Sequence, residues 1–417
     1  MAIQTNNSQD ISWVLAQIEH IAQFGQNASG ITRLAFTDDD LQARKYIIEL
    51  MQSAGLAVIT DAIGNIIGRY EPEGINPEAA TVMTGSHLDT VPSGGKYDGV
   101  LGIVCGLAAV SRLKTRDELK HPLEVVVFAA EESSRFSFAT IGSKAMAGLT
   151  NPAVLKRIKD HEEISLASEL EKIGLKIDNA LNAARPANSI KGFVELHIEH
   201  GELLDEKSIN IGIVDRVSAP TRLKITVTGM PGHSGAISIA ERQDALVSAS
   251  LIVLAIRNIA AEYEYKGAIG TVTILKTRPG AINVIPGKVE MWVDIRGTEH
   301  ESIVEMLQEI KDAVSSIADD NDTAVAIEVL ASEKPVSLSQ NLNQIIETVC
   351  SKLRLSSLRL DSRAGHDAMN IAYVAPAGLI FVPCKDGVSH NENEYINPKD
   401  IEAGLDVLTE TLYQLAK

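Results

Sequence analysis

The sequence predicts a mixed α/β protein of two domains, and three observations support that prediction. The chain has 417 residues, which exceeds the size at which a single core usually stops growing. Its first half alternates helical stretches with short apolar runs, and Leu123 to Ala130, LEVVVFAA, is typical of a strand covered on both faces. From about Ile213 the order becomes strand, helix, strand, strand, helix, strand, which describes a ferredoxin-like sandwich.

Helices and strands of the first domain are expected in alternation. Apolar residues at helical spacing predict helices, and short apolar runs predict strands. The expected helices are 11–24, 37–55 and 100–113, and the expected strands are 57–60, 65–69, 81–84, 123–130 and 193–196. The same α/β character returns near the C-terminus, with a helix at 342–353, a strand at 379–382 and a helix at 400–415.

That return indicates that the sandwich is inserted into the first domain. Its expected strands are 222–228, 268–276, 288–296 and 324–330, and its expected helices are 239–263 and 302–317. We therefore expect a catalytic domain formed by residues 1–212 and 331–417, with residues 213–330 inserted. The catalytic domain should hold a mixed sheet between helices, and the insertion should be a two-layer module.

Composition excludes several classes of protein. The net charge of −17 would repel phosphate backbones, and basic residues form no stripe with aromatics, so no nucleic acid is expected as a partner. No apolar run of 18 residues predicts a membrane span, and the N-terminus lacks the pattern of a signal peptide. Three cysteines without CxxC spacing predict neither a disulfide framework nor a thiolate zinc site. These features predict a cytoplasmic protein.

The stretch from Gly85 to Gly102, GSHLDTVPSGGKYDGVLG, has the residues with which a metal site can begin. His87 and Asp89 are two apart on an extended segment and point the same way. Asp89 could therefore accept a hydrogen bond from the imidazole N–H that faces away from a metal. Taken alone, this HxD pattern is equally consistent with a polar loop that closes a strand.

Other strand ends decide between the two interpretations. Ligands in open α/β sheets bind beyond the carboxyl ends of the strands. Four predicted strands are followed by histidine or carboxylate side chains that could ligate a metal, namely His87 with Asp98, Glu132, His197 and His390. We therefore favour a metal site.

Five candidate ligands are too many for one catalytic zinc ion, which takes three protein ligands and a water. They suit two ions if Asp98 bridges both. Imidazole and carboxylate donors fit Zn²⁺, Mn²⁺ or Co²⁺, and the sequence leaves the choice among these three open.

Two adjacent carboxylates, Glu131 and Glu132, follow the strand at 123–130. On an extended backbone they face opposite directions, so one can bind metal while the other acts as a general base. A pair of glutamates is usually a solvated loop, but here it directly follows a buried run.

Seven motifs together resemble the binuclear-metal aminoacylase and carboxypeptidase-type superfamily: GSHLDTVPSGGKYDGVLG, FAAEESSRF, ELHIEHG, GHSGA, AINVIPG, DIRG and SHNENEY. EESSRF and ELHIEHG are similar to its carbamoylase branch, which includes N-carbamoyl-L-amino-acid hydrolases and allantoate amidohydrolases. The resemblance covers the chain from about residue 30 to its end.

The resemblance implies a role for each matching position. The metal ligands would be His87, Asp98, Glu132, His197 and His390, with Asp89 orienting the first histidine and Glu131 as the general base. In the inserted domain, His233, Asn283 and Arg296 match residues that contact the substrate, with Arg296 suited to a carboxylate. His233 would polarise the carbonyl, and in dimeric relatives it comes from the partner subunit.

Some positions depart from the pattern of the relatives. His200 stands where relatives usually have glutamine, and Arg363 and Ser133 stand at common glycine positions. His200 and Arg363 are expected among the substrate contacts, so these departures affect the expected substrate choice. His366 and Asp367 are expected near the site, either binding substrate or holding a loop.

The resemblance implies a homodimeric metal-dependent amidohydrolase that cleaves the carbamoyl or ureido C–N bond of a small carboxylate, with two Zn²⁺ or Mn²⁺ ions per subunit. Dimerisation would use the inserted domain. One alternative is an aminoacylase or dipeptidase that acts on N-acyl amino acids or short peptides with the same metals. Another is a non-catalytic metal-binding paralogue, against which the retained Glu131 argues.

Overall fold

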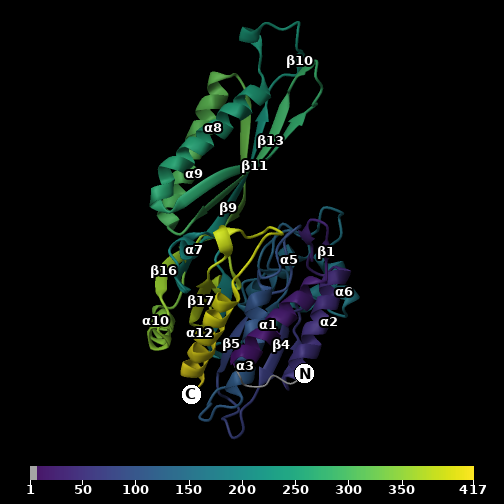
Figure 1. Ribbon diagram of the computed structural model, residues 1–417. Coiled ribbons are helices and arrows are strands. Elements are labelled where there is room, and N and C mark those ends of the chain that lie inside the picture. The colour runs from purple at the N-terminus through teal and green to yellow at the C-terminus, as the bar shows by residue number, and fades with distance from the viewer. Residues whose placement is uncertain (1–6) are drawn as a thin grey trace. The chain divides into compact units, whose positions relative to one another are not determined.

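The computed structural model describes residues 7–417, which form two compact units (Figure 1). The first unit comprises the chain up to Asp215, Ser337–Leu360 and His366–Lys417. The second comprises Arg216–Val336 and Asp361–Gly365. Residues 1–6, which belong to the stretch on which the expected absence of a signal peptide rests, lie outside the described residues.

The centre of the first unit is a nine-stranded mixed sheet with the order β15-β8-β17-β7-β5-β6-β4-β3, in which β16 also pairs with β8. Four central neighbours, β17, β7, β5 and β6, run parallel, whereas β4 is antiparallel to β6 and β8 is antiparallel to β17. The expected mixed α/β class is therefore confirmed. The strands are β3 (Ala57–Thr60), β4 (Ile66–Tyr70), β5 (Thr81–His87), β6 (Leu123–Phe128), β7 (Ile190–Ile198), β8 (Ile211–Val217), β15 (Val336–Ser337), β16 (Ser357–Ser362) and β17 (Ala377–Val382).

Helices of the first unit pack on this sheet and complete its core. The long ones are α1 (Asn7–Ala22), α2 (Asp38–Ser53), α3 (Val100–Leu113), α10 (Gln340–Leu353) and α12 (Pro398–Ala416). The short ones are α4 (Ile141–Met146), α5 (Pro152–Leu155), α6 (Leu166–Lys172), α7 (Leu203–Glu206) and α11 (Asp367–Ile371). α3 is apolar along almost its whole length because it packs against the sheet, α1 and α12. The three cysteines are unpaired and buried, as expected for small core residues.

The second unit is a four-stranded antiparallel sheet with the order β11-β13-β9-β14 and two long helices. Its elements in chain order are β9 (Ala219–Thr228), α8 (Ala245–Tyr263), β11 (Ala268–Arg278), β13 (Lys288–Gly297), α9 (His300–Asp320) and β14 (Ala324–Ser332). Residues of β13 alternate between buried and partly buried, because one face of the sheet packs against the helices. A small additional ladder pairs β10 (Gly232–His233) with β12 (Val284–Ile285).

Two differences from the expected elements have local causes. The helix expected at 239–263 begins at Ala245, because the Asp244 carboxylate caps it by accepting hydrogen bonds from the N–H groups of Leu246 and Val247. The strands β8 and β16 were not expected, since charged residues interrupt their short apolar stretches.

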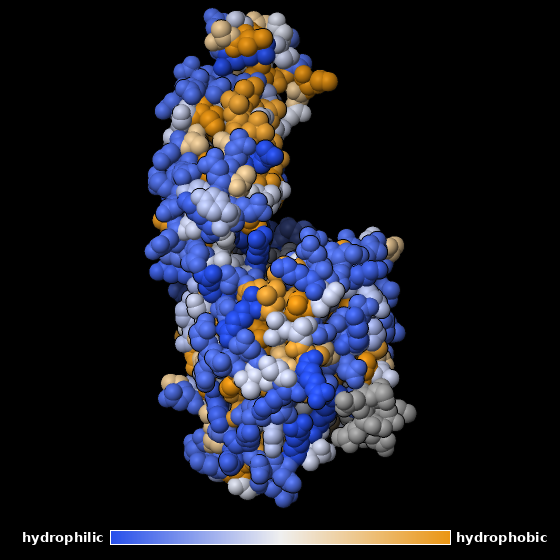
Figure 2. Space-filling view, turned by 60° about the vertical axis from the view of Figure 1, so that its left-hand side comes forward, coloured by the Kyte–Doolittle hydropathy of each residue, from blue (hydrophilic) through white to orange (hydrophobic). Residues whose placement is uncertain are grey.

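The helix α8 has an apolar composition that needs a structural account. Among the described residues, Ala245–Lys266 is the one helical stretch long and apolar enough to cross a membrane, with a mean hydropathy of 1.6. One side of α8 is buried against the sheet of the second unit. The opposite side leaves Val247, Leu251 and Leu254 exposed, and apolar side chains gather on the surface of this unit (Figure 2). The buried side of α8 is that of a core helix in a globular unit.

Candidate metal centre

The candidate ligands lie together because of the strand order. His87 is the last residue of β5, and His197 lies near the end of β7, while Glu132 and His390 follow β6 and β17. These four strands are parallel neighbours, so their carboxyl ends meet at one edge of the sheet. Asp98 comes from the loop before α3 and lies among them.

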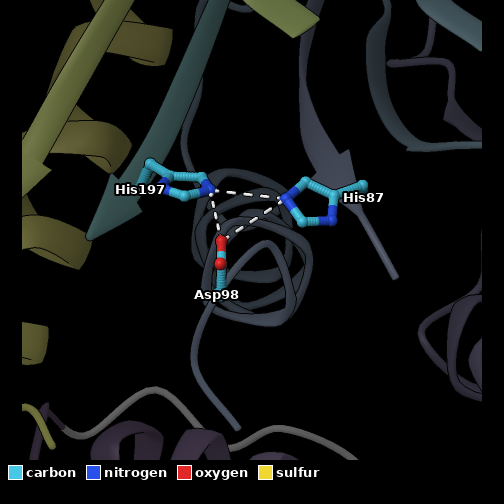
Figure 3. A group of neighbouring side chains, drawn as sticks. All are labelled: His87, Asp98 and His197. Atoms are coloured by element: carbon cyan, nitrogen blue, oxygen red, sulfur yellow. Dashed lines mark hydrogen bonds and ion pairs between the residues drawn. The ribbon is translucent and has the colours of Figure 1, made fainter. Parts of the chain in front are cut away.

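The first group of donors consists of His87, Asp98 and His197, whose side chains point toward one another (Figure 3). The two Nε2 atoms lie 3.5 Å apart, and Asp98 Oδ1 lies 3.1 Å from His197 Nε2 and 3.5 Å from His87 Nε2. Two ligands on one tetrahedral zinc ion are expected about 3.3 Å apart, given bond lengths of about 2.0–2.1 Å. The donors therefore fit a divalent metal ion.

Backbone carbonyls hold the rings of both histidines in the orientation that a metal ligand needs. His87 Nδ1 lies 2.9 Å from the Asp89 carbonyl oxygen, and His197 Nδ1 lies 3.0 Å from the Ile198 carbonyl oxygen. Because a carbonyl can only accept, each Nδ1 carries a proton and each Nε2 faces the centre, where it can bind a metal ion in place of a second proton.

This contact differs from the one expected for Asp89. The expected partner of the His87 ring was the Asp89 carboxylate, but the hydrogen bond is to its backbone oxygen. The carboxylate instead accepts hydrogen bonds from the backbone N–H groups of Glu131 at 3.1 Å and Glu132 at 3.0 Å. Asp89 thus orients His87 through its backbone and the two glutamates through its side chain.

The second group of donors lies on the other side of Asp98. His390 Nε2 lies 3.1 Å from Asp98 Oδ2 and 3.3 Å from Glu132 Oε1. Oδ1 of Asp98 faces His87 and His197, so its two oxygens face two different groups. This is the arrangement that a carboxylate bridging two cations requires.

Glu131 is a buried carboxyl group close to these donors. Its burial, together with the charges of Glu132, Asp367 and Asp89, raises its pKa well above the ordinary value, although His87 opposes the shift. A carboxyl group with a raised pKa is suited to take up and release a proton near neutral pH. The preceding Ala130 has a φ of 51°, a strained value for alanine that sets the direction of the two glutamates.

Interactions between Asp98 and the surrounding histidines shift the pKa values of Asp98 and His390 in the metal-free protein. Burial opposes ionisation of Asp98, but the surrounding histidines lower its pKa well below the ordinary value. Burial likewise opposes protonation of His390, but its bonds to Asp98 and Glu132 raise its pKa to about 10. Metal ions would therefore have to displace protons from the histidines when they bind.

Two further histidines lie beside these groups. The imidazole of His200 is centred 5.2 Å from that of His197 and 5.0 Å from that of His390. His366 is buried, and its ring centre lies 4.6 Å from that of His197. Burial and the charge of His197 lower the pKa of His366 well below its ordinary value, so its ring is neutral.

Sequence reasoning assigned no role to Glu394, which fixes the loop that carries Asp98. Its Oε1 accepts hydrogen bonds from the N–H groups of Tyr97 at 2.8 Å and Asp98 at 3.1 Å. A side chain at Gly95 would meet the Glu394 carboxylate at 2.3 Å, so only glycine permits this approach. Glu394 belongs to the motif SHNENEY, and its position four residues after His390 was the available signal.

Glu195 and Arg33 also support the site without having been predicted. The buried Glu195 carboxylate accepts hydrogen bonds from Ser86 Oγ at 2.7 Å and from the N–H of Ala368 at 2.8 Å. Arg33 is fully buried, and its Nε donates to the Leu88 carbonyl at 2.8 Å, between His87 and Asp89. Neither contact could be read from the sequence, because the partners are far apart along the chain.

Comparison with known proteins shows the family. Residues 83–414 match the family described as Peptidase family M20/M25/M40. The chain belongs to this family. It is 38% identical to an N-carbamoyl-L-amino acid amidohydrolase of Geobacillus stearothermophilus, over 94% of this chain and 95% of the relative. It is 32% identical to the allantoate amidohydrolase of Escherichia coli (strain K12), over 95% and 96%.

A solved structure is similar over almost the whole length. The crystal structure of AtUAH in complex with (S)-hydroxyglycine shares a TM-score of 0.89 and 32% identity, covering 98% of each chain. The predicted membership of the M20-type superfamily and its carbamoylase branch is confirmed. The expectation of a hydrolase that acts on non-peptide C–N bonds is confirmed by the names of the related amidohydrolases.

Four residues expected to contact substrate in this M20-family chain lie in its second unit. His233 and Asn283 are neighbours there, because β10 pairs with β12 and the N–H of Ser234 donates to the Asn283 carbonyl at 3.0 Å. Arg296 lies near the other end of β13, where its Nε donates to Asp294 at 2.9 Å. Arg363 is exposed and also belongs to the second unit.

Proposed function

We propose that this chain is a metal-dependent amidohydrolase that cleaves the carbamoyl or ureido C–N bond of a small carboxylate, of the N-carbamoyl-L-amino acid or allantoate type. The observation that carries the proposal is the position of Asp98, whose two oxygens face two groups of donors. Such a carboxylate suits a pair of divalent ions. The names of the relatives support the substrate class.

The residues that would hold the ions follow from these distances. His87, Asp98 and His197 would hold one ion, and Asp98, Glu132 and His390 the other. Nitrogen and carboxylate donors without a thiolate fit Zn²⁺, Mn²⁺ or Co²⁺. Bound there, such ions lower the pKa of a water and polarise a carbonyl.

Glu131 would carry the proton during the reaction. It takes a proton from the attacking water and delivers it to the leaving nitrogen, so that one water is added across the C–N bond. The Asp89 carboxylate fixes the backbone from which Glu131 extends. With an N-carbamoyl amino acid as substrate, the products are the amino acid, CO₂ and ammonia.

We also propose that residues 213–330 form a ferredoxin-like lid inserted into a catalytic domain made of residues 1–212 and 331–417, and that this lid dimerises the protein. The order of β9, α8, β11, β13, α9 and β14 and the antiparallel strand order support the lid. The exposed apolar side of α8, with Val247, Leu251 and Leu254, supports an interface between two copies.

The spacing of residues within the lid supports a shared active site. Arg296 lies near the end of β13, whereas His233 and Asn283 lie beside the loop that leads into the start of β13. At about 3.3 Å per residue, about 25 Å of strand separates Arg296 from the other two residues. One small substrate cannot contact both ends of a single lid. In a homodimer, one copy would supply His233 and Asn283 while the other supplies Arg296. His200, His366 and Arg363 are the other expected substrate contacts.

A screen for ammonia release tests the function. Metal-free protein is reconstituted with Zn²⁺ or Mn²⁺ and given N-carbamoyl-L-amino acids, N-carbamoyl-β-alanine, allantoate and ureidoglycolate. Release of ammonia from at least one of these is expected. Hydrolysis of dipeptides or N-acyl amino acids without ammonia release from this panel would instead favour the aminoacylase or dipeptidase alternative.

Replacement of the general base separates catalysis from metal binding. Glu131→Gln keeps the size of the side chain and removes its ability to take a proton, so metal content should stay at the wild-type level while turnover is lost. A Glu131→Gln protein with wild-type turnover contradicts the mechanism. A wild-type protein that binds metal but hydrolyses none of these substrates would favour the non-catalytic alternative.

A further inference from the structure

His200 occupies a position that its expected role as a substrate contact does not explain. It follows β7, and its Nε2 lies 3.5 Å from Asp98 Oδ1. Together with Asp98 and His390 it forms a group whose potential ligand atoms all lie within 4.8 Å of one another. His200 thus faces the same carboxylate as the ligands of the metal centre.

Two buried polar atoms in this group lack hydrogen-bond partners. His200 Nε2 and Asp98 Oδ1 are both buried without a well-aligned hydrogen bond, although Oδ1 forms close ion-pair contacts with the histidines around it. A buried polar atom without a partner destabilises the folded state, so such atoms are rare without a reason. An ion at the second position would accept the lone pair of His200 Nε2, and the ion between His87 and His197 would accept that of Asp98 Oδ1.

The grouping of His200 with His390 favours the second position. The potential ligand atoms of Asp98, His200 and His390 lie within 4.8 Å of one another. His390 Nε2 also lies 3.3 Å from Glu132 Oε1, so His200 lies beside the donors of the second ion.

We propose that His200 is itself a metal ligand, which binds through Nε2 at the second ion position together with Asp98, Glu132 and His390. The inference rests on the metal centre of the proposed function, but it does not depend on the reaction catalysed there. It assigns to this chain a donor that the resembling relatives, with glutamine at this position, do not have.

The extra donor has a consequence for the choice of metal. Without His200, the second position offers one imidazole and two carboxylates, and with it the position offers two of each. Imidazole nitrogen favours Zn²⁺ and Co²⁺, whereas Mn²⁺ is satisfied by carboxylate and water oxygens. The second position of this chain should therefore discriminate in favour of Zn²⁺ and Co²⁺ over Mn²⁺.

Metal titration of the whole metal-free protein tests this assignment. Wild type, His200→Gln and His161→Gln are titrated with Co²⁺, Zn²⁺ and Mn²⁺ by calorimetry, and the visible absorption of bound Co²⁺ is recorded. His161 is exposed and outside the donor groups, so it controls for the loss of a histidine. We expect His200→Gln to weaken the second Co²⁺ or Zn²⁺ by about 10–100-fold and to change the Co²⁺ spectrum, with a smaller effect on Mn²⁺.

The outcomes separate this inference from the proposed function. A His200→Gln protein that binds the second Co²⁺ with wild-type affinity and spectrum overturns the assignment, whether or not the enzyme hydrolyses carbamoyl substrates. If two ions bind as expected but no ammonia is released, the function fails and the assignment stands. A wild type that binds no divalent ion would overturn both.

A measurement on the wild type keeps the test independent of how the variant folds. X-ray absorption of the protein loaded with two Zn²⁺ ions counts the imidazole ligands around them. Four histidines shared by the two ions support the assignment, and three overturn it.

Discussion

The Glu394 carboxylate fixes the backbone of Asp98, because its Oε1 accepts a hydrogen bond from the Asp98 N–H at 3.1 Å. The same oxygen accepts a second hydrogen bond from Tyr97. Glu394 is buried, and it reaches the loop from a part of the chain nearly 300 residues away. Glu394 thereby fixes the position of the Asp98 backbone from a distant part of the chain.

Removal of this contact should weaken metal binding. Glu394→Ala leaves two backbone N–H groups without their acceptor, so we expect metal affinity to fall by about 10–100-fold. Glu394→Gln retains an acceptor oxygen and should lose less. Calorimetric titration of both variants with Zn²⁺ measures the effect, and wild-type affinity in Glu394→Ala would show that Asp98 is held by other contacts.

The same glutamate should make the stability of the metal-free protein depend on pH. Burial and the charge of Asp98 raise the pKa of Glu394 from 4.5 to about 7. Between these two pH values the folded state retains a proton that the unfolded state has lost. The contribution of Glu394 to the free energy of unfolding is therefore largest below pH 4.5, and it is lost as the pH rises through 7. This loss is at most about 3 kcal/mol.

Comparison with Glu394→Gln isolates this contribution, because glutamine does not titrate. Tm of wild type minus Tm of Glu394→Gln, measured with EDTA present, should decrease between pH 5 and pH 8. A difference that is constant or increases over that range would contradict the raised pKa of Glu394.

Substitution of Asp89 should separate the two metal positions. Asp89→Asn leaves the backbone carbonyl that holds His87 but replaces one of the two oxygens that accept from Glu131 and Glu132. The first ion should therefore bind with nearly wild-type affinity, whereas the ion held by Glu132 should bind more weakly and turnover should fall. Metal content after dialysis measures this, and equal loss of both ions would argue against separate roles.

Mixing two inactive variants tests the shared active site. In the proposed dimer, His233→Ala damages a contact supplied by one copy and Arg296→Ala a contact supplied by the other. In a mixed dimer, one of the two sites carries both defects and the other carries neither. Equal mixing makes about half of the dimers mixed, so about a quarter of the wild-type turnover should return. Each variant mixed with itself is the control. No recovery after verified subunit exchange would place all three contacts in one copy.

Much of the fold could be read from the sequence because the segments have strong periodicity. The helix expected at 100–113 is present as α3, and the run from Leu123 forms the central strand β6. The strands β8 and β16 were not predicted, since charged residues interrupt their apolar residues, in IGIVDRV and SLRLDS, and their pairing defines them.

For the site, the sequence by itself determined which side chains are candidates for the chemistry: histidine and carboxylate residues follow strands that had to be buried. Only the tertiary structure decided how they are arranged. The parallel order of β17, β7, β5 and β6 brings the four strand ends to one edge. The contacts of Glu394 with Asp98, of Asp89 with the glutamates, and of His200 with Asp98 join residues distant in the sequence. Local spacing carries no information about such contacts, because they depend on strand order and loop direction.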